Sequence, residues 1–569
     1  MTVRLRPPAE VMRLARMGAA HQTRLSFMRV LLRGLRRGGW TFSRPLWEID
    51  ANGIGRAVYR AQGQGQCYSL VAFAHDIPDA LRTDRVIAEA WDATFALVDG
   101  DASPADLDRL AANVPRQEAG RVSDRELVLS RANRSTRLWE YVVECLAQGH
   151  QPDPDRVAEV GYLMRTTAVY GSGKFGAADY SALAGRPLLD GPFRVEMLAV
   201  WLIRAFVLDL VEHAAAARGG DRAVTLDPEI RRSLGIGNST GLGMAPFLVS
   251  HPGLLNAWVV ARETAFARVR AVPEADSGAV DAFSKALART RRLLTGWQSD
   301  HPLQIAKLAE IRADAERLEE QISGGALARP APWQALWEWA TSALSVEGQE
   351  LAVSLMIEPY GDLVDGLADT MAADEIARFR IDGAMPVSEL RRILQENYAW
   401  ALGTDYAAPE ARARFWYVST AKLEPRLGER LTEDGADREQ PLDIGRAAAA
   451  LARDLAGASE DDTVAGFLRA NPRHRQVVRR VQQSRTAPYG EIRDNLISAE
   501  LLPVDMLRFK LAFFGATRFD PRSDRWVRIT MFQNAPFPYD IHDMPEDDWV
   551  LPCPAPCPAP RPATPPGDA

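Results

Sequence analysis

Residues 47–75 read WEIDANGIGRAVYRAQGQGQCYSLVAFAH, which is three short runs suited to β-strands separated by two turns. The first turn, Asn52-Gly53, is a strong hairpin signal, because both residue types accept the positive φ angles of a two-residue turn. The glycines of Gln62 to Gly65 mark the second turn, ahead of another apolar run. This stretch predicts an antiparallel β-meander, which we place in residues 41–83.

The segment before the meander, residues 1–40, is strongly basic. It holds nine arginines and one acid, a local charge of +8 in a chain whose net charge is −7. Its apolar residues from Phe27 to Leu35 follow helical spacing, with arginines on the other side. A transit peptide, a nucleic-acid arm and a membrane-surface helix are alternatives to a helix docked on the body. No aromatic residues for base stacking are interleaved, so we favour docking and do not expect nucleic acid as a partner.

After residue 84 the pattern becomes helical. Apolar residues at helical steps predict two antiparallel helices over 280–322, an internal hairpin that also offers a surface for self-association. The sequence therefore predicts a mainly α, α+β fold: a helical body with a small N-terminal antiparallel β-meander and a C-terminal β-hairpin. The expected segments are a basic helical arm 1–40, the meander 41–83, a helical region 84–275, a helical hairpin 276–326, a second α+β half 327–550 and a disordered proline-rich tail 551–569.

Composition limits the class of protein. The chain has 569 residues, 47% hydrophobic and 25% charged, which is ordinary for a folded soluble protein and excludes a disordered or collagen-like chain. Four cysteines, two of them in the tail, give no disulfide framework. The most apolar stretch, Val195 to Ala217, contains four charged residues, so we predict a buried helix and no membrane insertion. Without a secretion signal, the cytoplasm is the expected location. The histidines lack ligand spacing, so no metal site is predicted, and the cofactor is left open.

The strongest local motif is the glycine-rich stretch 235–246, GIGNSTGLGMAP. Backbone amides in such a loop can converge on a phosphate or carboxylate. The spacing is one residue too long for a dinucleotide fingerprint, and no Gly-Lys-Ser/Thr is present for a P-loop. We therefore predict an anion-binding loop whose substrate-binding residues are Gly235, Gly237, Asn238, Ser239, Thr240 and Gly241.

The same stretch also fits the nucleophile elbow G-x-S-x-G at Gly237 to Gly241. An elbow needs a strand before the serine, a helix after it and alternation of strands and helices. The apolar run before Ser239 is too short for such a strand, and Pro246 interrupts the segment in which the helix would lie. A serine hydrolase using Ser239 therefore stays an alternative.

A second glycine-rich stretch, Tyr170 to Gly176, contains Lys174 but fails the P-loop pattern at Ala168 and Phe175. Lys174 is one of only five lysines in an arginine-rich chain and could contact an anion. Tyr170 could supply acid or base chemistry.

Other candidates come from polar residues in apolar surroundings. Arg194 begins the apolar helix and is expected to be buried and paired, as a further anion ligand. Tyr489 lies in a Pro-Tyr-Gly turn and Glu491 directly follows it, in a segment that echoes residues 359–365, and both are predicted acid–base groups. Asp209 and His213, four residues apart, could pair on one helix face, but a polar last turn explains them as well.

Together these features predict an enzyme that acts on a small anionic metabolite bearing a carboxylate or phosphate. The expected catalytic residues are Tyr170, Lys174, Tyr489 and Glu491, and the reaction class is left open. The alternatives are the serine hydrolase and a non-catalytic helical scaffold or binding protein that uses the 280–322 hairpin.

Overall fold

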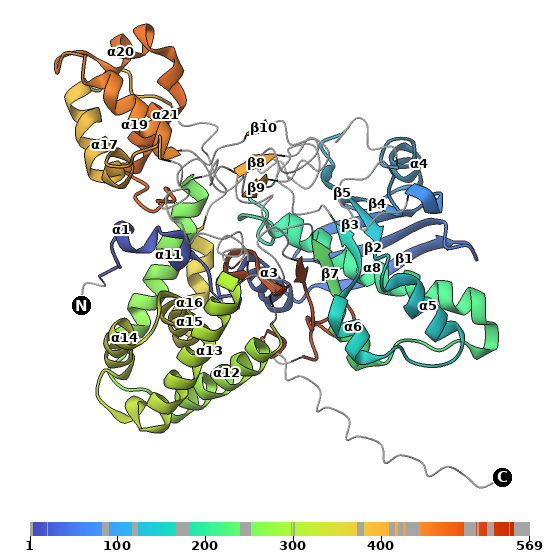
Figure 1. The fold of residues 1–569 in the computed structure, drawn as a ribbon. Coiled ribbons are helices and arrows are strands. Elements are labelled where there is room, and N and C mark those ends of the chain that lie inside the picture. The colour runs from blue at the N-terminus through green and yellow to red at the C-terminus, as the bar shows by residue number, and fades with distance from the viewer. Residues whose placement is uncertain are drawn as a thin grey trace.

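The computed structural model places the chain in a sheet region, a helical body and a small helical module (Figure 1). The residues that it describes are 4–19, 21–81, 90–115, 123–166, 183, 185–238, 252–297, 299, 302–371, 380–408, 416–418, 425–427, 438–439, 444–493, 508, 511–520, 528–544 and 547–550.

Among the described residues nine strands form one sheet, in the order β1-β2-β3-β4-β5-β6-β7-β12-β11. All neighbours are antiparallel except β6 and β7, which run parallel. A smaller sheet has the order β10-β8-β9. The bounds are β1 Thr41–Ile49, β2 Gly55–Gly63, β3 Gln66–Ala74, β4 Ala93–Asp99, β5 Glu126–Arg134, β6 Tyr162–Thr166, β7 Gly235–Asn238, β8 Trp416–Val418, β9 Pro425–Leu427, β10 Arg438–Glu439, β11 Ala516–Asp520 and β12 Arg528–Met531.

This sheet corrects the predicted fold class. The first three strands lie where the meander was expected. The prediction of a small meander and a separate C-terminal hairpin is nevertheless wrong, because both belong to one larger sheet. Strands β4 to β7 extend the sheet through the region that we predicted to be helical. The C-terminal hairpin joins the same sheet, because Thr530 of β12 pairs with Gly237 of β7. Pairing between strands so far apart in the sequence leaves no local pattern, which is why periodicity missed it.

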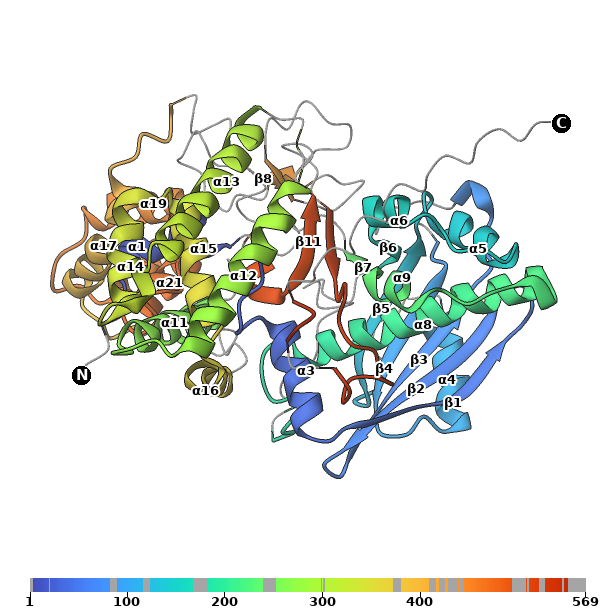
Figure 2. The same cartoon turned by 90° about the horizontal axis from the view of Figure 1, so that it is seen from below.

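One long helix, α8 (Arg194–Gly219), lies along one face of the sheet (Figure 2). Its apolar residues are buried, as predicted for a core helix, and the ring of Phe206 packs edge-on against Phe95 of β4 at 5.5 Å. Helix α4 (Pro104–Asn113) covers part of the other face. None of the described helices is long and apolar enough to cross a membrane.

The helical body is built on α11 Pro252–Arg270, α12 Ser277–Thr295, α13 Pro302–Ser323, α14 Pro332–Ala343 and α15 Val346–Ile357. Helices α12 and α13 occupy the positions of the predicted hairpin. Their apolar sides face inward: the ring of Phe283 packs against Trp333 at 5.4 Å, and Leu318 is fully buried. The remaining α-helices outside the module are α1 Pro8–Val11, α2 Leu14–Met17, α3 Phe27–Arg37, α5 Trp139–Ala147, α6 Pro154–Val160, α9 Pro228–Ser233 and α16 Gly361–Val364.

The basic N-terminal arm is docked on this body through buried ion pairs. Arg6 contacts Glu263 and Glu350, each at 2.7 Å. Arg29, whose side chain is fully buried, contacts Glu358 at 2.7 Å and Asp547 at 3.2 Å. The arm's charge is therefore largely balanced inside the molecule.

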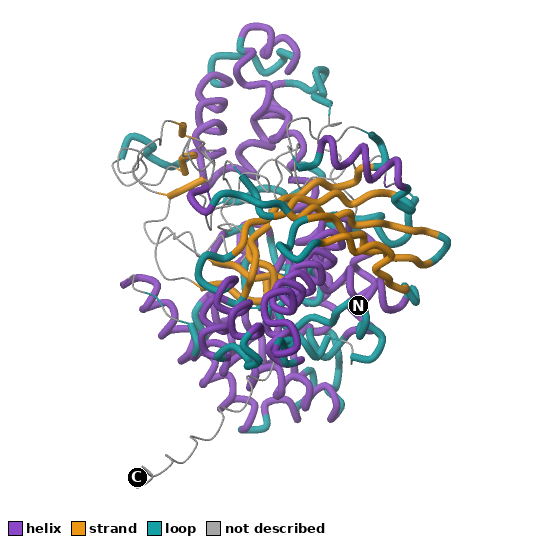
Figure 3. The backbone as a smooth tube through the Cα atoms, turned by 90° about the vertical axis from the view of Figure 1, so that its right-hand side faces the viewer, coloured by secondary structure: helices purple, strands orange, loops and turns teal. Residues whose placement is uncertain are grey.

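The helical module has its own hydrophobic core, separate from the main one. It consists of α17 (Val387–Leu402), α19 (Ile444–Leu455), α20 (Val464–Ala470) and α21 (Arg475–Ser484). These helices pack together at the top of the molecule in Figure 3, at the opposite end from α12 and α13. The module is thus a distinct packing unit at one end of the chain's fold.

Candidate functional site

The candidate site lies where the parallel strands β6 and β7 end at one edge of the sheet. Helix α8 connects the two strands, which makes β6-α8-β7 a β-α-β unit inside an otherwise antiparallel sheet. In their register Arg165 pairs with Gly237 and Thr166 with Asn238. Both strands therefore end side by side, at an edge of the kind where α/β sheets bind ligands.

Both predicted glycine-rich stretches continue from this edge. Residues 167–176 follow Thr166, and residues 239–246 follow Asn238. The backbone of Asn238 belongs to β7, while Tyr170, Lys174, Ser239, Thr240 and Gly241 lie outside the described residues. The paired residues Thr166 and Asn238 thus lie four residues before one predicted stretch and within the other.

Gly235 and Gly237 have a different role from the one predicted. They belong to β7, so the expected loop begins as a strand, and their backbone is engaged in strand pairing. A Cβ on Gly237 would lie 2.7 Å from the Tyr162 ring, and one on Gly235 would lie 2.4 Å from the carbonyl oxygen of Met531. These glycines are required because neighbouring strands pack closely.

A row of polar residues crosses the sheet beside this edge. Asn133, Arg165, Gly237 and Thr530 occupy directly paired positions on β5, β6, β7 and β12, so the side chains of Asn133, Arg165 and Thr530 share one face. Asn133 and Thr530 are buried, and Arg165 is half-buried. The Asn133 side chain accepts a hydrogen bond from the backbone N–H of Asp92 at 3.1 Å. These strands therefore bury polar side chains at positions where apolar side chains would cost less free energy to bury.

A neighbouring row on the same face holds Thr94 of β4 and Arg131 of β5. Arg131 stands two residues before Asn133, and because Ala132 pairs with Thr166 it borders the carboxyl end of β6. Its guanidinium lies over the Trp91 ring, 4.2 Å from the centroid. The arginines at positions 131 and 165 thus place two cationic groups on one face at this edge.

His75 completes the described surroundings. Its Nε2 atom lies 2.7 Å from the Thr94 hydroxyl, and burial lowers the pKa of the imidazole to about 4. The ring is therefore neutral at pH 7 and acts as a hydrogen-bonding group without charge. We call Thr94, Arg131, Asn133, Arg165 and Thr530 the polar face.

The remaining predicted residues lie elsewhere. The side chain of Arg194, at the start of α8, contacts the carbonyl of Pro187 and the carboxylate of Asp369. The Tyr489 hydroxyl donates to the carbonyl of Arg6 at 2.6 Å, and burial raises its pKa. Glu491 accepts hydrogen bonds from Tyr398 and Arg480 at the base of the module. In the described part of the chain no hydrogen bond or ion pair joins Tyr489 or Glu491 to the polar face.

Asp209 and His213 do not form a pair. Asp209 accepts hydrogen bonds from Tyr59, Arg44 and Arg231, and it serves as an anchor between α8 and its neighbours. The Nε2 atom of His213 lies 2.7 Å from the carbonyl oxygen of Asp50. Within the described ranges no three His, Cys, Asp or Glu side chains form a group able to hold a metal ion.

The polar face was not predicted from the sequence, although a signal was present. Leu127 to Arg134 and Tyr162 to Thr166 are apolar runs interrupted by polar residues at their ends. Once both runs are known to be central strands, these residues stand out as buried polar groups. Comparison of the chain with models of protein families, with curated proteins and with solved structures gave no match.

Proposed function

We propose that this protein is an enzyme that binds a small anionic metabolite, bearing a carboxylate or phosphate, at the carboxyl edge of β6 and β7. One observation carries the proposal: Thr166, four residues before the stretch from Tyr170 to Gly176, pairs with Asn238, which belongs to the stretch 235–246. Ligands of α/β proteins bind at such edges, where backbone amides and side chains from two connections converge.

The polar face supports the charge of the proposed ligand. Arg131 and Arg165 share one face at this edge, and guanidinium groups suit carboxylate and phosphate oxygens in a bidentate manner. Lys174 and the amides after Asn238 would add further donors. Among the predicted acid–base groups, Tyr170 stays in this proposal, whereas Tyr489 and Glu491 are engaged away from the edge.

The test is calorimetric titration and thermal shift of the full chain against carboxylates, phosphates, nucleotides and acyl-CoAs. A ligand at a hundredfold excess over its Kd stabilises the fold by about 2.7 kcal/mol. We expect a hit that Arg165→Gln and Lys174→Ala each weaken at least tenfold, while the exposed Arg222→Gln leaves it unchanged. Silence across the library, or a hit that neither variant weakens, would overturn the proposal.

A serine hydrolase using Ser239 is the second candidate, favoured by a specific observation. Strand β7 directly precedes Ser239, and β6-α8-β7 forms a β-α-β unit. This unit was not recognisable from the sequence pattern. Labelling with a fluorophosphonate distinguishes this candidate. Modification of Ser239, abolished in Ser239→Ala, would favour the hydrolase over simple anion binding.

The scaffold alternative gains less support. The apolar sides of α12 and α13, which would provide a self-association surface, are packed within the chain against α14 and α15. Self-association through residues 280–322 stays a proposal for measurement by analytical ultracentrifugation.

A further inference from the structure

The module contains the most strongly basic stretch outside the N-terminal arm. Residues 463–490 hold six arginines and no Asp or Glu, in a chain of net charge −7. Three of these arginines, at 469, 473 and 475, are exposed to solvent. This stretch forms α20, the short 3₁₀ helix η8 (Pro472–His474) and α21.

The arrangement separates apolar from basic side chains. Val464, Phe467, Val478 and Val481 are buried in the module's core. The arginines at 469, 473 and 475 are exposed, and Arg453 of α19 is exposed beside them. We call Arg453, Arg469, Arg473 and Arg475 the basic surface.

Most of this charge is uncompensated. Among the described residues Arg453, Arg469 and Arg475 have no ion-pair partner. Arg473 does have one, the carboxylate of Asp454, yet its side chain is 71% exposed. A surface that holds four arginines beside one carboxylate, Asp454, favours an anionic partner by charge complementarity.

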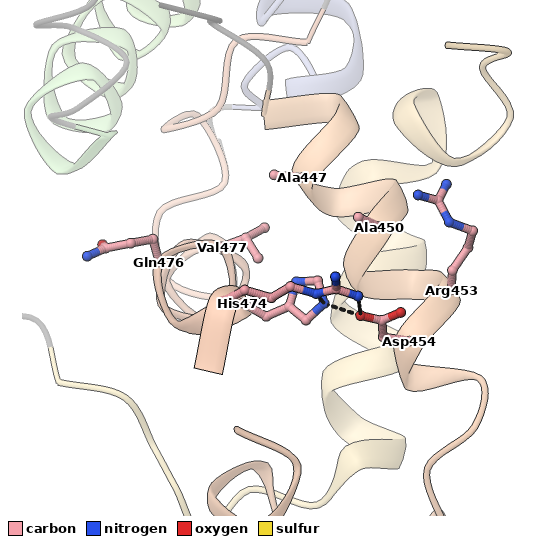
Figure 4. Close-up of a pocket in the computed structure, with 8 residues that line it drawn as sticks. Ala447, Ala450, Arg453, Asp454, His474, Gln476 and Val477 are labelled. Carbon is pink, nitrogen blue, oxygen red and sulfur yellow. Dashed lines mark hydrogen bonds and ion pairs between the residues drawn. The ribbon is translucent and has the colours of Figure 1, made fainter. Parts of the chain in front are cut away.

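Two residues of the basic surface, Arg453 and Arg473, line a hollow of about 380 Å³ (Figure 4). His474 lies at its floor, with the ring stacked on Phe467 at 5.9 Å and Nε2 2.5 Å from Asp454. Asp454 is the only carboxylate of the lining, and hydrogen bonds with His474 and Arg473 lower its pKa. Arg453, Arg473 and Gln476 line the rim, so the hollow offers hydrogen-bond donors and net positive charge.

We propose that the basic surface binds the phosphodiester backbone of a nucleic acid. The arginines lie on α19, α20, η8 and α21, so they are spread over the module and do not converge on one point. A chain with repeated phosphates can engage several of them at once, whereas one phosphate group on a peptide cannot.

An anionic membrane fits the surface less well. Membrane-surface helices insert apolar side chains next to their basic ones. The apolar side of α21 instead faces the module's core, and of the described large apolar side chains that are exposed none belongs to the module. No exposed aromatic side chain is present among the module's described residues for base stacking, so backbone contacts without sequence preference are expected.

The basic surface differs from the N-terminal arm, on which alone nucleic-acid binding was judged from the sequence. In the arm the buried Arg6 is paired with Glu263 and Glu350, and the buried Arg29 with Glu358 and Asp547. The basic surface, in contrast, keeps its charge available to a partner. It does not depend on the site proposed at β6 and β7.

The test is fluorescence anisotropy of the full chain with a DNA duplex of about 24 base pairs, its single strand, and RNA of the same sequence. Binding should weaken linearly on a log–log plot between about 50 and 200 mM salt. The triple variant Arg453→Gln/Arg469→Gln/Arg475→Gln should lose at least about tenfold in affinity, with the salt slope reduced by about 2 to 3.

Two controls make the result specific. Arg329→Gln removes an exposed arginine in the body and should change neither affinity nor slope. Asp454→Asn removes the one carboxylate of the hollow and should strengthen binding severalfold. All the altered side chains are at least partly exposed, so circular dichroism should show unchanged folding.

Several outcomes would overturn the inference: no binding at about 50 mM salt, equal binding by the triple variant, or weaker binding by Asp454→Asn. Tighter binding to phosphatidylserine vesicles or to a phosphopeptide than to any of the nucleic acids would also overturn it. A preference among the duplex, the single strand and RNA would identify the source of the phosphodiester.

Discussion

Arg6 and Glu350 of α15 form an ion pair at 2.7 Å although 344 positions separate them in the sequence. Glu263 of α11 accepts two more hydrogen bonds from the same guanidinium, at 2.7 and 2.8 Å. None of the three side chains is more than 4% exposed. Buried Arg262 also contacts both carboxylates, at 3.0 Å from Glu263 and 3.7 Å from Glu350, so two arginines and two glutamates balance one another in this cluster.

Glu350→Ala should therefore lower the free energy of unfolding by about 3–5 kcal/mol, the cost of an unpaired buried charge. Urea denaturation measures this change. The matched control is Asp281→Ala, which breaks an i,i+4 ion pair with Lys285. The side chains of Lys285 and Asp281 are 67% and 62% exposed, so this change should cost less than about 0.5 kcal/mol. Similar losses in the two variants would contradict the role assigned to Arg6.

Acid should destabilise the protein through Glu263. The neighbouring Arg6 and Arg262 outweigh burial and lower the pKa of this carboxyl from 4.5 to about 2. The folded pKa lies below the unfolded one, so the contribution is complete above pH 4.5 and is lost as pH falls towards 2. Unfolding free energies measured from about pH 5 to 3 should fall, and more shallowly in Glu263→Gln. Parallel curves would refute this assignment.

His75 should act in a higher pH window. Burial lowers its pKa from 6.5 to about 4, so its contribution is complete above pH 6.5 and is lost as pH falls towards 4. The difference across that window should be on the order of 2 kcal/mol. His75→Gln should remove part of the pH dependence of the unfolding free energy between about pH 7 and 5. Urea denaturation at each pH measures this free energy. An unchanged dependence would show that His75 is protonated normally.

Gly237→Ala should destabilise the sheet by about 1–3 kcal/mol, because the added Cβ would meet the Tyr162 ring and the Arg165 stem at 2.7 Å. Differential scanning calorimetry provides the measurement. Gly403→Ala, whose Cβ would meet no atom within 4 Å, should change stability by less than about 0.5 kcal/mol. A tolerated Gly237→Ala would show that β7 can shift away from β6.

The elements predicted correctly are those with strong local patterns. The first three strands of the sheet were visible because Asn52-Gly53 predicts a hairpin. Helix α8 was visible as the most apolar stretch of the chain, and α12 and α13 because their apolar residues recur at helical steps. Strand β7 had no such pattern, since two of its four residues are glycine. It becomes a strand because β6 and β12 pair with it on both sides.

The candidate site was predictable only in part. The two glycine-rich stretches could be chosen from sequence, but the pairing of Thr166 with Asn238 depends on a register between distant strands. Tyr489 and Glu491 were predicted to be acid–base groups. The sequence could not distinguish this role from a structural one, because a polar residue at a turn has the same local pattern in both cases. Their partners, the Arg6 carbonyl and Tyr398, are set by tertiary packing.

The pairing of β12 with β7 constrains how the chain can fold during synthesis. Strand β7 is flanked on one side by β6 and on the other by residues 528–531, so β7 is left as an unpaired edge of the sheet until nearly the whole chain has left the ribosome. The contact of Arg29 with Asp547 spans 518 positions and must form as late. Such long-range closure slows folding and leaves unpaired strand edges exposed in the meantime. Nascent chains of this protein should accordingly depend on chaperone protection until translation ends.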